Sequence, residues 1–101
     1  MAEKVPLWSK ELNIPKESQQ KAIAIANRFL EILPDYRKYE EKVYAASLLM
    51  ADLTVRPSDA SVKQYQIAEK SGFSEYTIRK YRRKISKTLP EKTKKELGFY
   101  F

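Results

Sequence analysis

Apolar residues recur at intervals of three and four along much of this chain, which is the spacing of one face of an α-helix. The clearest example lies between Lys16 and Leu33, where polar residues separate a set of apolar positions, namely Ala22, Ile23, Ala26, Phe29, Leu30 and Leu33. Pro34 and Asp35 follow directly and end the pattern. The spacing therefore predicts a long amphipathic helix over residues 16–33.

A second stretch, from Val43 to Leu53, is apolar at nine of eleven positions and is interrupted only by Ser47 and Asp52. A helix that is apolar on nearly every side must be surrounded by other helices. The alternative is a buried strand, but alanine, leucine and methionine favour a helix. We therefore predict a central buried helix whose alanines let its neighbours approach closely.

The segments that flank these two helices look less regular. Pro6 and Pro15 lie close together, so residues 1–15 are predicted to form an arm with at most a short turn. Trp8 would pack this arm on the body, with a partner surface as the alternative. Residues 34–42 are polar apart from Tyr36 and Tyr39, and they are predicted to form a connection with about one helical turn that covers the edge of the core.

Residues 61–89 have the spacing of a helix-turn-helix, because small Ala68 is followed by Gly72 and then by Ile78. Ser74 stands where the second helix needs an N-cap. The first helix is predicted over 61–71, with capping candidates at Ser58, Asp59 and Ser61 and with a buried set of Val62, Tyr65, Ile67 and Ala68. The second is predicted over 75–89 before Pro90, with a core face of Ile78, Tyr81, Ile85 and Leu89.

The last residues, 90–101, form a basic and aromatic tail that can add one or two helical turns up to Leu97. Phe99, Tyr100 and Phe101 would be costly in water, so we expect them to dock on this body or on a second copy as a homodimer. A chain of 101 residues is one domain by length. The predicted fold is all-α, with four or five helices, a central buried helix and a C-terminal helix-turn-helix.

The amino-acid composition excludes several kinds of functional site. The chain contains no cysteine and no histidine, which excludes disulfides, zinc sites built from thiolates or imidazoles, and catalysis that depends on those groups. The carboxylates of Glu40 and Glu41 are adjacent and diverge, so we expect no enzyme, no metal and no cofactor. No run approaches the ~20 apolar residues that span a bilayer, and the start of the chain lacks a signal-peptide pattern. We expect a cytoplasmic, nucleoid-associated protein.

The charge is unevenly distributed. Up to Ser61 there are nine basic and nine acidic residues, whereas the remaining forty carry eleven and four, which leaves the whole net charge of +7 there. Six basic residues follow Glu75 before the next acid: Arg79, Lys80, Arg82, Arg83, Lys84 and Lys87. Solubility is one explanation. The coincidence with the helix-turn-helix favours the other, a surface that binds nucleic acid.

If Ile78 points into the core, helical geometry turns the opposite face of the second helix toward the major groove of double-stranded DNA. Tyr76, Arg79 and Lys80 would read bases, whereas residues further along would contact phosphate. Arg82 borders the buried face and is free to pair within the domain. The predicted DNA-binding residues are Ser74, Glu75, Tyr76, Thr77, Arg79, Lys80, Arg83, Lys84 and Lys87.

Two segments resemble the transcription factor IIB family, including archaeal transcription factor B. The run VYAASLLMA, residues 43–51, is similar to the family's alanine-rich central helix, and Gln66-Ile67-Ala68 followed by FSEYTIRKYR, residues 73–82, is similar to the end of its second cyclin-like repeat. The resemblance implies a five-helix cyclin-box fold and DNA contact through the last helix. It also implies partners such as the TATA-binding protein or the RNA polymerase machinery.

The chain also departs from this family. It has a single repeat, no cysteine for a zinc ribbon, and Gln66 where the family usually has glutamate. These departures favour a small single-repeat regulator, or a shortened fragment, over a general initiation factor. The alternative function is a cyclin-box scaffold that binds another transcription component instead of DNA.

Overall fold

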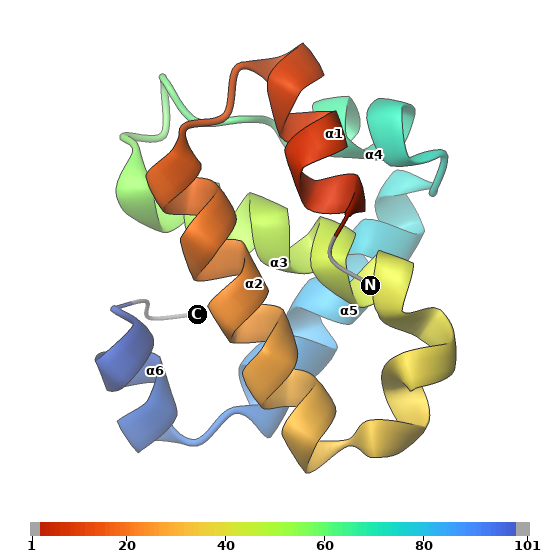
Figure 1. Ribbon diagram of the computed structural model, residues 1–101, viewed down its shortest axis with the longest axis vertical. Coiled ribbons are helices and arrows are strands. Elements are labelled where there is room, and N and C mark those ends of the chain that lie inside the picture. The colour runs from red at the N-terminus through yellow and green to blue at the C-terminus, as the bar shows by residue number, and fades with distance from the viewer. Residues whose placement is uncertain (1–2, 99–101) are drawn as a thin grey trace.

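The computed structural model describes residues 3–98, and helices form almost all of it (Figure 1). In chain order the elements are α1 (Lys4–Leu12), α2 (Lys16–Ile32), the 3-10 helix η1 (Pro34–Tyr39), α3 (Glu40–Val55), α4 (Gln64–Ser71), α5 (Glu75–Thr88) and α6 (Glu91–Leu97). No strand occurs in these residues, which confirms the all-α prediction. The prediction of four or five helices was too low, because this part of the chain forms six α-helices.

The central helix is α3, which packs against α1, α2, η1, α4 and α5. In Figure 1, α2 passes in front of α3 and α5 passes behind it. Every residue from Val43 to Asp52 is buried, so the predicted central buried helix is confirmed. It is longer than predicted because Glu40 and Glu41 form its first turn, where acidic side chains interact favourably with the helix dipole.

The N-terminal arm was predicted wrongly, because residues 4–12 form the helix α1. Pro6 lies in its first turn, where the missing N–H would have no partner within the helix. Pro15 is the N-cap of α2, so neither proline breaks a helix. Between them, Asn13 takes a left-handed conformation with φ of 55° and ends α1. Trp8 is 5% exposed, which agrees with the predicted packing on the body.

The two helices of the predicted helix-turn-helix are α4 and α5, joined by the three residues 72–74. Gly72 has φ of 81°, which costs glycine little, and its N–H donates to Ala68 O. The Ser74 hydroxyl accepts from the Thr77 N–H at 3.1 Å, so the predicted N-cap is confirmed. The predicted core face of α5 is confirmed as well, because Ile78, Tyr81 and Ile85 are buried, as is Leu89, the C-cap of this helix.

Two details of α4 were predicted wrongly. The helix begins at Gln64 instead of residue 61, and its first N–H groups are capped neither by Ser58, Asp59 nor Ser61. Instead, the Gln66 side chain accepts from the Lys63 N–H at 2.8 Å. Tyr65 is 57% exposed. It was expected in the core together with Ile67, but two positions on a helix differ by about 200°, so both cannot face α5 and α3.

The loop between α3 and α4 is held by a buried carboxylate. Asp52 is completely buried and accepts hydrogen bonds from the Ser18 hydroxyl (2.7 Å), from two guanidinium nitrogens of Arg56 (2.8 and 2.7 Å) and from the Val62 N–H (2.6 Å). We call these four residues the Asp52 cluster. Burial alone would raise the pKa of Asp52, but the three donor groups outweigh it and hold that pKa below its ordinary value.

The tail forms the short helix α6, which packs against α2 as the predicted extra turns up to Leu97 suggested. Lys21 donates to Leu97 O, and Arg28 pairs with Glu96 at 3.1 Å. The aromatic residues 99–101 lie outside the described residues, so their docking and the homodimer stay predictions. None of the helices within residues 3–98 has the length and apolarity needed to span a membrane.

Candidate nucleic-acid interface

The predicted site residues lie mainly on the exposed side of α5, opposite the buried Ile78. Tyr76 is 68% exposed, and the cationic side chains that follow it are exposed too, namely Arg79, Lys80, Arg83, Lys84 and Lys87. The remaining three members are engaged at the start of the helix. Ser74 and Thr77 share a hydroxyl hydrogen bond of 3.0 Å, and Glu75 accepts from the Gln64 amide at 3.3 Å. These three side chains therefore shape the start of the helix, and Tyr76 and the five cations form the rest of its exposed side.

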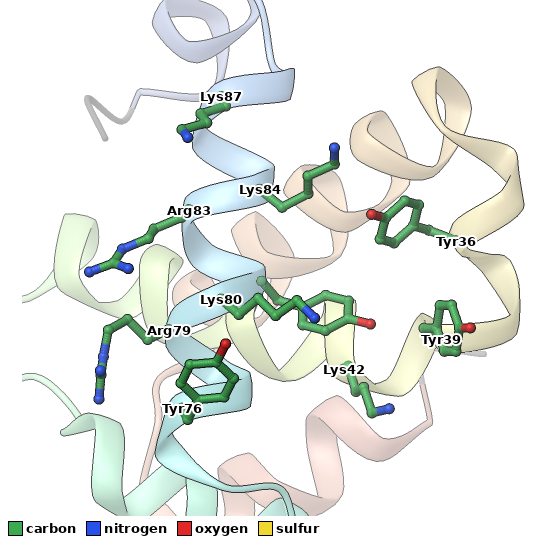
Figure 2. Close-up of a pocket in the computed structure, with 10 residues that line it drawn as sticks. Tyr36, Tyr39, Lys42, Tyr76, Arg79, Lys80, Arg83, Lys84 and Lys87 are labelled. Carbon is green, nitrogen blue, oxygen red and sulfur yellow. The ribbon is translucent and has the colours of Figure 1, made fainter.

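The exposed side of α5 is divided into two chemically different flanks. Figure 2 shows that Lys80 and Lys84 point toward η1, whereas Arg79 and Arg83 point to the opposite side of the helix. The division follows from sequence spacing, since residues four apart share a flank and adjacent residues do not. The flank toward η1 therefore carries the ammonium groups of Lys80 and Lys84, and the other flank carries the guanidinium groups of Arg79 and Arg83, followed by Lys87.

A groove of about 590 Å³ separates α5 from the wall formed by η1 and the start of α3 (Figure 2). Its lining contains six cations and four tyrosines: Tyr36, Tyr39, Lys42, Tyr76, Arg79, Lys80, Tyr81, Arg83, Lys84 and Lys87. No acidic residue of the described chain lines it. The cations of α5 were predicted from the sequence, but this wall was not, because residues 34–42 were taken as a connection at the core edge.

The tyrosines join the groove to the core. Tyr36 makes edge-to-face contacts with Phe29 (ring centroids 5.2 Å apart), with Tyr39 (6.1 Å) and with Tyr81 (6.1 Å). Phe29 is fully buried in α2 and Tyr81 is buried in α5, where burial raises the pKa of the Tyr81 phenol. These contacts fix η1 to both helices, so the wall of the groove is a packed part of the fold.

A second hollow of about 410 Å³ lies on the arginine flank of α5 and is lined by Met50, Gln64, Arg79, Arg82, Arg83 and Ser86. Arg82 donates to the Gln64 side chain at 3.1 Å, so its predicted pairing within the domain is confirmed. Burial lowers the pKa of Arg82, and the charges of Arg79 and Arg83 lower it further. Arg82 therefore supports α5, whereas Arg79 and Arg83 remain exposed.

Five exposed cations of α5 have no acidic partner among residues 3–98. Ion pairs occur elsewhere in residues 3–98, for example between Lys70 and Glu11 at 3.1 Å, but none involves Arg79, Lys80, Arg83, Lys84 or Lys87. Like charges four residues apart on a helix repel one another, so this flank carries a cost in free energy. A polyanion placed along it would remove that repulsion and be attracted by it.

Comparison of the chain with protein families, with curated proteins and with solved structures found no match. The resemblance to the transcription factor IIB family therefore stays a prediction from residues 43–51 and 66–82. The geometry and charge of this surface are therefore the evidence for its function.

Proposed function

We propose that this protein binds double-stranded DNA through α5 and acts as a sequence-specific transcription regulator. One observation carries the proposal: the second helix of a helix-turn-helix exposes five cations that form no ion pair within residues 3–98. Such helices enter the major groove, where phosphates neutralise the flanking cations and the helix start meets base edges.

The roles follow from position along α5. Tyr76 and Arg79 lie in its first turns, from which side chains reach bases, and arginine to guanine is the commonest specific pairing. Arg83, Lys84 and Lys87 lie further along and suit phosphate. Sequence position alone suggested base readout for Lys80 too. Its direction toward η1 (Figure 2) fits the phosphate backbone better, so we assign it there.

One helix of this kind covers too few base pairs to select a site in a genome. We infer that the protein acts either as a homodimer or beside a partner that is already bound to DNA. The resemblance of Val43–Ala51 and residues 66–82 to a cyclin-like repeat suggests the second route, with a TATA-binding protein or the polymerase machinery as the partner.

Charge reversal at Arg79 and Arg83 tests the proposal. We expect the double variant Arg79→Glu/Arg83→Glu to lose about 100-fold in affinity for duplex DNA in fluorescence anisotropy. The base contact of Arg79 contributes about 1–3 kcal/mol, and the reversal at Arg83 replaces a phosphate contact by repulsion. The four cations of α5 that are assigned to phosphates should by themselves make log K fall with log salt at a slope of about −3.6, at about 0.9 each.

The matched control is Lys10→Glu/Lys16→Glu, which changes the net charge equally. Both side chains are exposed, on α1 and at the start of α2, and the 17 residues of α2 separate Lys16 from η1. This control should lose much less affinity than the α5 variant. Equal affinities for the two double variants would contradict the proposal and favour the alternative, a scaffold that binds another protein.

A further inference from the structure

The wall opposite α5 has its own arrangement of cations, outside the helix-turn-helix. The Nζ atoms of Lys38 and Lys42 lie 5.4 and 5.2 Å from the ring centroid of Tyr39, and Lys42 Nζ also lies 5.8 Å from the Phe73 ring. Ammonium groups at these distances are attracted by aromatic rings. The Tyr39 ring therefore holds two positive charges together at the edge of the groove.

The α5 side of the groove repeats this pairing of lysine with tyrosine. Lys84 Nζ lies 5.9 Å from the Tyr36 ring centroid, and Lys80 points to the same wall (Figure 2). Positive charge therefore faces the groove from both sides. Ammonium groups lie near the rings of both Tyr36 and Tyr39, so these rings help to orient the cations.

The two kinds of cation around α5 suit different parts of DNA. Lysine is a compact point charge that binds phosphate without demanding a planar geometry, whereas the fork of arginine matches the guanine edge. Lys80 and Lys84 point across the groove toward the wall that carries Lys42 (Figure 2). Arg79 and Arg83 also line the groove, but their side chains point to the far flank of α5. A helix in the major groove has a phosphate strand beside it, and this cation-lined groove runs alongside α5.

We propose that the η1–α3 wall, with Lys38, Tyr39 and Lys42, binds the phosphodiester backbone of one strand of duplex DNA. That strand lies in the groove between this wall and Lys80 and Lys84. The inference rests on the proposed function of α5 and extends it, because it adds a second surface, from a segment distant in sequence, that binds the phosphate backbone of the DNA. Its contribution to affinity is independent of base sequence.

Lys42→Ala tests this wall, with Lys16→Ala as the matched control at the far end of α2. By anisotropy on a duplex, Lys42→Ala should reduce the magnitude of the salt slope by about 0.9. The affinity ratio of native protein to variant should then fall about 3.5-fold between about 50 and 200 mM salt. Lys42→Arg should restore the slope, and equal melting temperatures would show that both variants fold.

Two further arms separate this inference from the function on which it rests. If Arg79→Ala weakens duplex binding while Lys42→Ala behaves like Lys16→Ala, the wall is wrong and the role of α5 stands. If neither variant differs from Lys16→Ala, both proposals are wrong. If Lys42→Ala weakens binding of a single-stranded oligonucleotide more than binding of the duplex, the groove is a single-strand site and the inference is overturned.

Discussion

In the Asp52 cluster the charge is paired within the chain, whereas in the groove beside α5 the charges are all of one sign. In the first, one buried carboxylate collects donors from α2, from the end of α3 and from the loop before α4. In the second, six cations line one hollow without a single acid from the described chain. Burying a charge is costly unless it is paired, and gathering like charges is costly unless something outside the chain neutralises them.

The difference separates what holds the fold from what is available to a ligand. Donors of the same chain supply the hydrogen bonds that Asp52 accepts, so its carboxylate ties the α3–α4 loop to α2 and is not available to a partner. The groove cations contribute nothing comparable to the fold, and their mutual repulsion opposes it. Variants of Asp52 should therefore lower stability, whereas variants that remove groove cations should lower DNA affinity without destabilising the fold.

The largest expected effect is on stability, from Asp52→Ala. The change leaves the Val62 N–H and the Ser18 hydroxyl without their acceptor and removes the partner of Arg56. Breaking a buried ion pair from one side costs about 3–5 kcal/mol, which urea denaturation would measure as a lower midpoint. The control Asp59→Ala removes an exposed acid and should change stability by less than about 0.5 kcal/mol. Equal midpoints for the two variants would contradict this account of Asp52.

The same carboxylate predicts how stability depends on pH. Because the pKa of Asp52 is lowered by folding, its contribution is complete above the unfolded value of about 3.9 and is lost as pH falls through the folded value. The urea midpoint of the native protein should therefore fall below about pH 4. Asparagine does not titrate in this pH range, so the midpoint of Asp52→Asn should fall less. A parallel fall in both proteins would exclude Asp52 as the main titrating group.

The outcome of the sequence predictions depended on how local each signal was. The helices over 16–33 and 75–89 were predicted correctly because helical periodicity is written within each segment. The arm was wrong because Pro6 was taken as a breaker, although proline is tolerated in the first turn of a helix. The start of α4 was wrong because its cap comes from Gln66, inside the helix, and not from a serine before it.

The candidate site likewise has one part that the sequence predicts and another that it does not. The cations of α5 follow one another in sequence, so their clustering could be predicted from charge and helical spacing. Tyr39 and Lys42 belong to another segment, and their approach to α5 depends on the aromatic contacts of Tyr36 with Phe29 and Tyr81. No pattern in residues 34–42 signals this. The Asp52 cluster escaped prediction for the same reason, since its donors come from separate helices and loops.

A smaller effect, of opposite sign, is expected from Arg83→Glu. Arg83 stands four residues from both Arg79 and Lys87 and three from Lys80, so the reversal turns three repulsive pairs into attractive ones. We expect a gain of about 1 kcal/mol in low salt, measured by urea denaturation, together with weaker DNA binding. Arg83→Gln should gain about half as much, and at about 1 M salt both gains should vanish. A loss of stability in low salt would show that Arg83 supports the fold.

The smallest effect concerns α3 itself, which carries a second buried polar side chain beside the satisfied Asp52. Ser47 is fully buried, and its hydroxyl has no hydrogen-bond partner within residues 3–98. Ser47→Ala removes that unmet group and improves helix propensity, so we expect stability to rise by about 0.5 kcal/mol. Ser18→Ala, the same chemical change in the Asp52 cluster, should instead lose about 1–2 kcal/mol because it removes a hydrogen bond to a charged group. Equal effects of the two variants would mean that burial, and not the bond to Asp52, decides what a hydroxyl costs in this core.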